Sequence, residues 1–228
     1  MNTLNTVAGG PGERRQPELR DLLFGDMPME RWVGNGSLLQ PLPWNAFASA
    51  RADFARGDRE TAVKKWEWIA RRPALEARHY LQAWHFLRGA GSEPAPEIAN
   101  QLLGIVVEVG MDRGVDYLAA YTDHSVRYYN SSGKSVFWEH GSESMNPWID
   151  PLLEASRRVV LQIGPWRSAR PPAPPKNRVR LNFLTPSGLH FGEAPLNEMA
   201  NDPVGSEVLY RAGQLMQALI EVRQAPAA

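Results

Sequence analysis

The spacing of apolar residues changes once along the chain, from a helical period to a strand period. Between residues 44 and 87, apolar side chains recur at every third or fourth position, which predicts amphipathic helices. We expect these helices over 44–56, 58–71 and 75–87, with breaks at Gly57-Asp58, at Pro73 and at the RGAGSEP segment. From Leu102 onward, β-branched runs and period-two alternation indicate strands.

The strand-like half of the chain also contains two helical patterns. Four strand runs, LLGIVVEVG, VDYLAAYTD, SVRYYN and SVFWE, are joined by short segments rich in turn formers. A helical stripe in NPWIDPLLEASRRVVLQIG follows, then the strands RVRLNFL and LHFGE around TPSG, and a last helix with apolar positions from Val208 to Ile220. The order ββββ–α–ββ–α predicts an α+β fold in which an antiparallel sheet carries its helices on one face.

These patterns divide the chain into four parts. Residues 1–28 are rich in Gly, Pro, Arg and Asn without a sustained period, and we expect a flexible N-terminal arm. A helical region is predicted over 29–92, an α+β sheet domain over 98–223 and a disordered tail over 224–228. The boundary lies at GAGSEPAPE, where Gly and Pro interrupt regular structure on both sides.

The first two predicted helices have small residues and an aromatic at the positions that a tight helical hairpin requires. Small side chains let two helices approach closely, Gly57 permits a tight turn, and Trp66 fills the space between the helices; the full set is Ala50, Gly57-Asp58, Ala62, Trp66, Ala70 and Pro73. On these residues, segment 44–75 resembles a single tetratricopeptide-type helical hairpin. Ile69 departs from the small residue that the repeat favours, and no second copy follows. The resemblance implies only a TPR-like shape that could dock a partner.

Composition excludes several classes of chemistry. The absence of cysteine removes thiolate catalysis, thiolate metal sites and disulfides. Lys and Arg number 25 and Asp and Glu 25, so no global positive field attracts a phosphate backbone, and we do not expect nucleic-acid binding. No apolar run reaches the roughly 18–20 residues that span a bilayer, and the N-terminus lacks the pattern of a signal peptide. We expect a cytoplasmic protein without membrane insertion.

No catalytic or metal-binding motif is present in the sequence. HExxH, GxSxG and the phosphate-binding loops are absent, and SSGKS (131–135) joins two predicted strands, where we interpret it as a hairpin turn with Gly133 at positive φ. The candidate metal ligands near strand ends are Asp123, His124, Glu139 and His140, and adjacent pairs among them project to opposite faces of a strand. We predict no catalytic residues, no cofactor and no metal.

Two surfaces stand out as candidates for binding. Strand alternation predicts that one set of residues shares a side of the sheet: Val115, Tyr117, Ala119, Tyr121, Val126, Tyr128, Val136 and Trp138. Arginine beside aromatic side chains on the third helix suits an interface. The predicted ligand or partner surface comprises Tyr117, Tyr121, Arg127, Tyr128, Trp138, Trp84 and Arg88. The PxxP segment RPPAPPK (170–176) is interpreted as a stiff linker, and its alternative is a ligand for an aromatic groove.

The function predicted from these patterns is a non-catalytic adaptor or scaffold that binds another protein, with a homodimer through the sheet or its edge left open. The alternative is a small-molecule sensor or enzyme with a pocket between the sheet and the helical region. A cavity of several hundred Å³ with convergent polar groups favours this alternative, and an open aromatic patch favours the adaptor. A convergent His/carboxylate or Ser/His geometry within hydrogen-bond distance, inside a cleft, would contradict the absence of catalysis.

Overall fold

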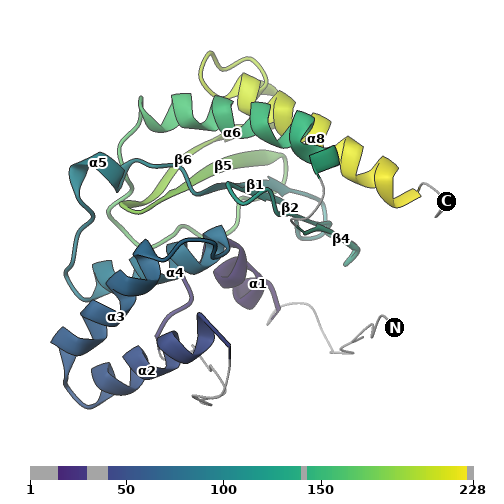
Figure 1. The fold of residues 1–228 in the computed structure, drawn as a ribbon. Helices are drawn as coiled ribbons and strands as arrows, with labels where there is room; N and C mark the ends of the chain where they lie inside the picture. The colour runs from purple at the N-terminus through teal and green to yellow at the C-terminus, as the bar shows by residue number, and fades with distance from the viewer. Residues whose placement is uncertain (1–14, 30–40, 140–142, 225–228) are drawn as a thin grey trace.

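The computed structural model describes residues 15–29, 41–139 and 143–224, and it has the α+β architecture that the sequence predicts. In the N-terminal half, α1 (Arg15–Phe24) is followed by α2 (Trp44–Ala55), α3 (Arg59–Arg71), α4 (Ala77–Gly89) and the short α5 (Pro96–Ala99). A six-stranded sheet with two long helices on its far face follows (Figure 1). The predictions for residues 1–14, 225–228 and His140 lie outside the described residues.

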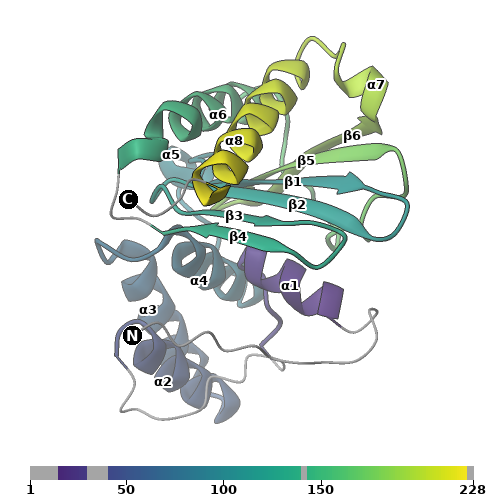
Figure 2. The same ribbon diagram turned by 90° about the vertical axis from the view of Figure 1, so that its right-hand side faces the viewer.

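The sheet is antiparallel throughout. Its strands are β1 (Gly104–Gly110), β2 (Val115–Tyr121), β3 (Val126–Tyr129), β4 (Ser135–Trp138), β5 (Arg178–Thr185) and β6 (Gly188–Pro195). The spatial order is β4-β3-β2-β1-β5-β6, so β1 and β5 are neighbours although three strands and a long helix separate them in sequence (Figure 2). The turns follow the predicted chemistry, and Gly133 in SSGKS has φ +87°.

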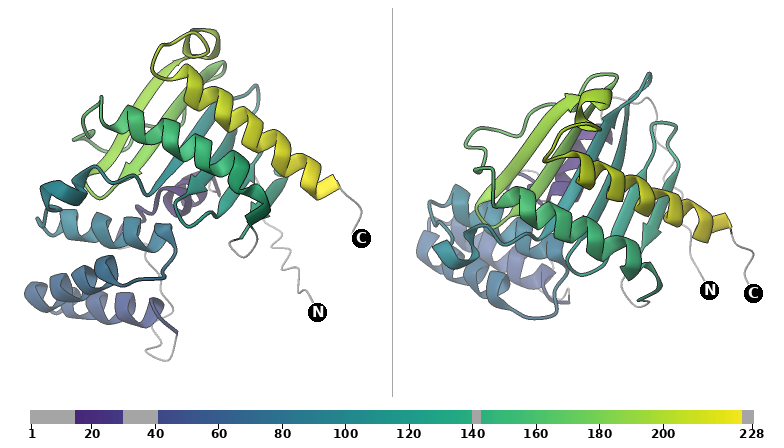
Figure 3. Two further views of the ribbon diagram at one scale, coloured as in Figure 1. Left: turned by 45° about the horizontal axis from the view of Figure 1, so that its top comes forward. Right: turned by 90° about the horizontal axis from the view of Figure 1, so that it is seen from above.

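Two long helices cover one face of the sheet. They are α6 (Asn146–Val160), which follows the short 3-10 helix η1 (Glu143–Met145), and α8 (Ser206–Gln224), which follows the short α7 (Leu196–Met199). Figure 3 shows α6 and α8 side by side across the strands. Their apolar stripes meet the sheet at Ile105, Leu181 and Phe183, all of which are buried. Within the described residues, no helix combines the length and apolarity that crossing a bilayer requires.

The opposite face of the sheet is covered by α1 and α4. Leu23 and Phe24 of α1 and Leu81 of α4 are buried against this face. The Tyr121 hydroxyl donates to the Leu23 carbonyl at 2.6 Å, which fixes the end of α1 on the sheet. Within the part of segment 1–28 that the structure describes, helix α1 stands where a flexible arm was predicted. The apolar residues of α1 are too few to show a helical period in the sequence, and they are buried only through contact with the sheet.

The aromatic strands do not share one face, contrary to the prediction. Three residues, Thr122, Asp123 and His124, lie between the paired Tyr121 and Ser125, with His124 at φ +62°. A loop with an odd number of residues keeps odd-numbered positions on one face. The aromatic set is therefore split: Val115, Tyr117, Ala119 and Tyr121 lie under α1 and α4, whereas Val126, Tyr128, Val136 and Trp138 lie under α6 and α8.

Helices α2, α3 and α4 occupy the predicted segments. They form an apolar cluster of their own, in addition to the clusters on the two faces of the sheet. Gly57, at φ +87°, allows the tight turn between α2 and α3, and the Asp58 side chain caps α3 by accepting from the Thr61 amide at 3.1 Å. Trp66 is fully buried at the centre of this cluster. One face of α4 contributes Phe86 and Leu87 to it, while Leu81 faces the sheet. The helical region and the sheet are therefore joined through α4.

Candidate functional site

A buried carboxylate anchors α1 to the sheet. Glu108 on β1 has no exposed surface, and its Oε1 accepts from Arg20 Nε of α1 at 2.7 Å. Its Oε2 accepts from Arg180 Nη1 at 3.4 Å and from Asn182 Nδ2 at 3.2 Å, both on β5. We call Arg20, Glu108, Arg180 and Asn182 the Glu108 network. Two guanidinium groups balance the buried charge, and Arg180 also pairs with Glu193.

The proline-rich segment crosses the sheet beside this network. Its carbonyls are acceptors for buried arginines, since Arg20 donates to Pro171 at 3.0 Å and Arg180 donates to Pro172 at 2.6 Å. The segment also passes so close to β1 that a Cβ on Gly110 would lie 2.0 Å from the Pro175 oxygen. These contacts support the interpretation of 170–176 as a stiff linker, because the extended segment is part of the packed structure.

A second ion cluster holds the start of that segment against the end of α1. Arg170 Nη2 donates to Asp21 at 2.7 Å, and Arg170 Nε donates to Asp26 at 2.8 Å. Its guanidinium also lies 4.4 Å from the centre of the Phe24 ring. Burial raises the pKa of Asp26, and the charge of Arg170 acts against that rise. The loop between α6 and β5 is thus held against the end of α1.

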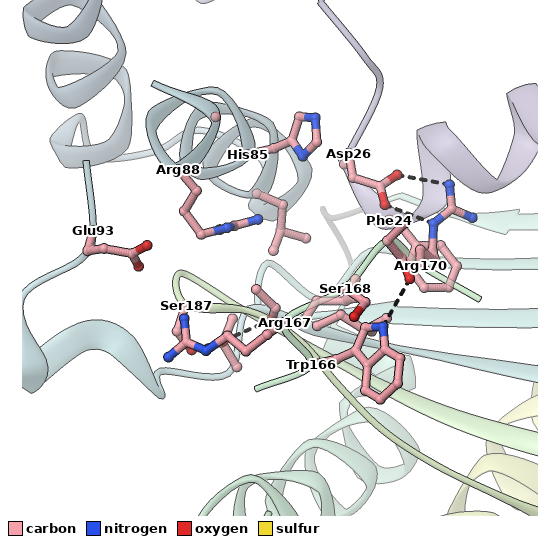
Figure 4. Close-up of a pocket in the computed structure, with 18 residues that line it drawn as sticks. Phe24, Asp26, His85, Arg88, Glu93, Trp166, Arg167, Ser168, Arg170 and Ser187 are labelled. Atoms are coloured by element: carbon pink, nitrogen blue, oxygen red, sulfur yellow. Dashed lines mark hydrogen bonds and ion pairs between the residues drawn. The ribbon is translucent and has the colours of Figure 1, made fainter. Parts of the chain in front are cut away.

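A cavity of about 450 Å³ lies between α4, the end of α1, the loop 164–170 and the β5–β6 turn (Figure 4). We call it the arginine pocket. Its position between the helical region and the sheet is the one that the sensor or enzyme alternative requires. Its lining combines apolar, charged and hydroxyl groups: Phe24, Gly25, Asp26, Leu81, His85, Arg88, Gly89, Glu93, Trp166, Arg167, Ser168, Ala169, Arg170, Leu184, Thr185, Ser187, Gly188 and Leu189.

Two arginines reach the arginine pocket from opposite walls. Arg88 comes from the last turn of α4, and Arg167 comes from the loop across the cavity (Figure 4). Arg88 donates to the Pro186 carbonyl, and neither arginine forms an ion pair with a carboxylate among the residues that the structure describes. Burial lowers the pKa of Arg88, with Glu93 and Asp26 acting in the opposite direction. Among the described residues, the two guanidinium groups therefore have no contacting carboxylate, although Glu93 and Asp26 lie close enough to act on Arg88 through their charge.

A serine–histidine pair lies at the β5–β6 turn: Ser187 is a lining residue of the arginine pocket, whereas His190 pairs with Phe183 and has its side chain on the face under α6 and α8. Ser187 Oγ is 3.2 Å from His190 Nε2, and His190 Nδ1 is 3.0 Å from the Ile163 carbonyl oxygen. A carbonyl only accepts, so Nδ1 carries the proton and Nε2 presents its lone pair to the serine hydroxyl. Burial lowers the pKa of His190, and the charge of Arg167 lowers it further. The fold therefore favours the neutral form of this imidazole.

The predicted surface residues are distributed over both faces of the sheet, and only one of them lines the arginine pocket. Tyr117, Tyr121 and Arg127 lie on the face under α1 and α4, whereas Tyr128 and Trp138 lie on the other. Burial raises the pKa of Tyr117 to about 12, with a smaller contribution from the charge of Glu108. Trp84 is partly buried between the sheet-facing cluster and the helical cluster. Arg88 alone of the seven lines the cavity.

The candidate metal ligands are engaged in separate interactions. Asp123 accepts from the Ala77 amide at the start of α4, His124 pairs with Asp150 at 2.8 Å, and Glu139 pairs with Arg127 at 2.7 Å. Across the described segments, no three His, Asp or Glu side chains are grouped so as to hold a metal ion.

Ser187 and His190 were not singled out from the sequence. The sequence TPSG is typical of a turn, and Thr185 pairs with Gly188 so that Pro186 and Ser187 form the tip of the β5–β6 turn. In such a hairpin, the serine and a histidine three residues later can meet. The sequence pattern that could have pointed to this pair is a serine at the second turn position followed three residues later by a histidine. Many turns without any functional role have the same pattern.

Two buried histidines predict acid lability. Burial lowers the pKa of both His79 and His190, so the folded protein favours their neutral forms. Their contribution to stability is present above the unfolded pKa, near 6.5, and is lost as pH falls through the lower folded values. Chemical denaturation at pH 7 and pH 5 should show a falling free energy of unfolding, by at most about 1.4 kcal/mol per pH unit for each histidine. The loss should be smaller in His79→Gln, and an equal loss in both proteins would contradict the assignment.

Comparison with known proteins adds no relative from which a function could be transferred. No family model, no curated protein and no solved structure matches this chain.

Proposed function

We propose that this protein binds a small organic anion in the arginine pocket, with Arg88 and Arg167 holding its carboxylate or phosphate group. The observation that carries this proposal is the partly buried guanidinium of Arg88, which faces a cavity of about 450 Å³ without a carboxylate partner in the described chain. A cavity of this size accommodates a ligand of metabolite dimensions.

The physical argument rests on the cost of burying a charge. A guanidinium taken out of water without an opposite charge is destabilising, and within the described segments Arg88 donates to one carbonyl, that of Pro186. An anion supplies what is missing, because the planar fork of arginine matches carboxylate and phosphate oxygens in pairs. Glu93 at the same cavity reduces the net positive charge, which favours small anions over polyanions.

The test is calorimetric titration with two probes, glutarate and inorganic phosphate. At least one should bind, and Arg88→Gln should weaken it by about 10- to 100-fold, since hydrogen bonds to charged groups contribute about 1.5–3 kcal/mol. Arg71→Gln is the matched control, because Arg71 lies exposed on α3 away from the cavity, and it should bind as the wild type does. Absence of binding by both probes, or wild-type affinity in Arg88→Gln, would refute the proposal.

Binding of another protein, or of a second copy of the chain, remains a prediction. The aromatic residues on which it relied are covered by helices on both faces of the sheet. One feature of the helical region still favours it: Trp68 on α3 is 45% exposed, and Arg72 lies 4.9 Å from its ring centre. Arginine on tryptophan is a frequent composition of interface hot spots. Sedimentation analysis should show a dimer that Trp68→Ala weakens; a monomer at all concentrations would exclude self-association.

A further inference from the structure

We propose that the ligand of the arginine pocket is a zwitterion, a free α-amino acid with an apolar side chain, whose carboxylate is held by Arg88 and whose ammonium group is held by Glu93. The inference rests on the proposed function, since the carboxylate is the anionic group that the pocket binds. It names the class of molecule that carries this group.

One edge of the Arg88 guanidinium is engaged and the other is open. Nη1 donates to the Pro186 carbonyl at the β5–β6 turn, whereas Nε and Nη2 make no hydrogen bond within the described segments. Gly188 leaves free the space beside these two atoms, where a Cβ would lie 3.7 Å from Nε and 4.0 Å from Nη2. Nε and Nη2 form a fork that matches the two oxygens of one carboxylate. The bond to Pro186 therefore holds the guanidinium in place while its carboxylate-binding edge stays available.

A carboxylate lies near this guanidinium without pairing with it. Glu93, on the connection after α4, lines the same cavity, and Figure 4 shows its carboxylate pointing toward Arg88. Burial lowers the pKa of Arg88, and the charge of Glu93 is the largest effect that opposes this, so the two groups are neighbours. They form no ion pair with each other, and Glu93 has no ion-pair or hydrogen-bond partner among the residues that the structure describes. A cation and an anion are thus held close together but out of contact.

The other charged groups of the arginine pocket do not fill this gap. Arg170 pairs with Asp21 and Asp26, so the buried carboxylate of Asp26 already has its cation. Arg167 extends from the facing loop and forms no ion pair in the described chain, and it supplies a second donor to the bound carboxylate. The pocket therefore offers open guanidinium groups and one open carboxylate, that of Glu93.

The closeness of the two open charges selects the class of ligand. In an α-amino acid, the carboxylate and the ammonium group are bonded to the same carbon, so they reach protein groups that are neighbours. A dicarboxylate or a phosphate fills the Arg88 fork but places further negative charge near Glu93, which weakens its binding. An amine without a carboxylate leaves the guanidinium unpaired. A ligand with both charges satisfies both groups.

The remaining wall of the cavity indicates an apolar side chain on the ligand. Phe24, Leu81 and Leu184 line the cavity and belong to the apolar cluster between α4 and the sheet. An aliphatic group that leaves water to contact them is stabilised in proportion to its buried area. The volume of about 450 Å³ leaves room for a side chain of leucine size beside the charged groups.

The experiment is calorimetric titration with three probes of one carbon skeleton. They are L-leucine, 4-methylpentanoate, which lacks the ammonium group, and 3-methylbutylamine, which lacks the carboxylate. Leucine should bind about fivefold more tightly than 4-methylpentanoate, the upper end for a charge pair that is open to solvent, because Glu93 is exposed. The amine should bind most weakly of the three, since it leaves Arg88 without an anion.

Glu93→Gln tests the ammonium contact. It should weaken leucine binding by about fivefold and leave 4-methylpentanoate at least as tightly bound, so that the advantage of leucine disappears. Unchanged 4-methylpentanoate binding also shows that the pocket of this variant has folded. Arg88→Gln should weaken both ligands by about 10- to 100-fold. Glu97→Gln is the matched control, because Glu97 is exposed on α5 and does not line the cavity, and it should keep the advantage of leucine.

The outcomes separate this inference from the proposed function. Leucine that binds no more tightly than 4-methylpentanoate, or a leucine advantage that persists in Glu93→Gln, overturns the zwitterion. The proposed function then stands if glutarate or phosphate binds in a manner that depends on Arg88. Failure of leucine, 4-methylpentanoate, glutarate and phosphate alike overturns both proposals.

Discussion

Replacing Glu108 with Gln should lower the free energy of unfolding by about 3–5 kcal/mol, because it removes the only negative charge between two buried guanidinium groups of the Glu108 network. The new amide nitrogen would face the donors of Arg20 or Arg180, since it cannot accept hydrogen bonds. Arg180 would keep Glu193, but Arg20 would retain only the Pro171 carbonyl among its described partners. Urea denaturation followed by circular dichroism measures the change.

Glu154→Gln provides the matched control for the same chemical change. Glu154 is half-exposed on α6 and pairs with Arg157 at 3.2 Å, so its loss should cost less than about 1 kcal/mol. Equal costs for the two variants would mean that the Glu108 network does not hold α1 on the sheet. A restored stability in the triple change Arg20→Met, Glu108→Leu, Arg180→Met would show that the network supplies specificity more than stability.

Trp66→Ala should destabilise the protein by about 3–5 kcal/mol, the range observed when a large aromatic is removed from a core. Trp66 is fully buried on α3, with Phe54 and Phe86 ring centres at 5.5 and 5.4 Å. The vacated space would adjoin α4, which also packs on the sheet. The unfolding transition seen by near-ultraviolet circular dichroism should therefore shift for the whole protein in a single step.

Trp66→Phe separates packing from the polar atom of the indole. Trp66 Nε1 is buried without a hydrogen-bond partner in the described chain, so its removal offsets part of the lost contact area. We expect less than half the cost of Trp66→Ala. Two separate transitions in Trp66→Ala, one for the helices and one for the sheet, would contradict the coupling through α4.

The arginine pocket depends on these same supports. Arg88 lies one turn after Trp84 and two turns after Leu81 on α4, and the loop that carries Arg167 is fixed by Arg170 to Asp21 and Asp26. The Glu108 network positions α1, whose end forms one wall. Variants that loosen α1 or α4 should therefore weaken anion binding even where they do not touch the cavity.

The amino-acid sequence by itself determined the six strands, the long helices α2, α3, α4, α6 and α8, and their order. Period-three and period-four spacing located α2, α3 and α4, and alternation located the strands, because burial of one face imposes these local patterns whatever the neighbour is. Glycine at Gly57 and Gly133 marked turns for the same local reason, since both adopt positive φ.

Only the tertiary structure decided which surfaces meet. The odd number of residues in the β2–β3 loop placed Tyr117 and Tyr128 on opposite faces of the sheet. Helix α1, which shows little periodicity of its own, covers the face that carries Tyr117, and Arg20 holds it there by pairing with Glu108, 88 positions away in sequence. Arg88 and Arg167 came together at one cavity because the loop 164–170 and the β5–β6 turn lie beside α4. Local patterns record that a residue is buried, but the partner that buries it is fixed by packing between distant segments.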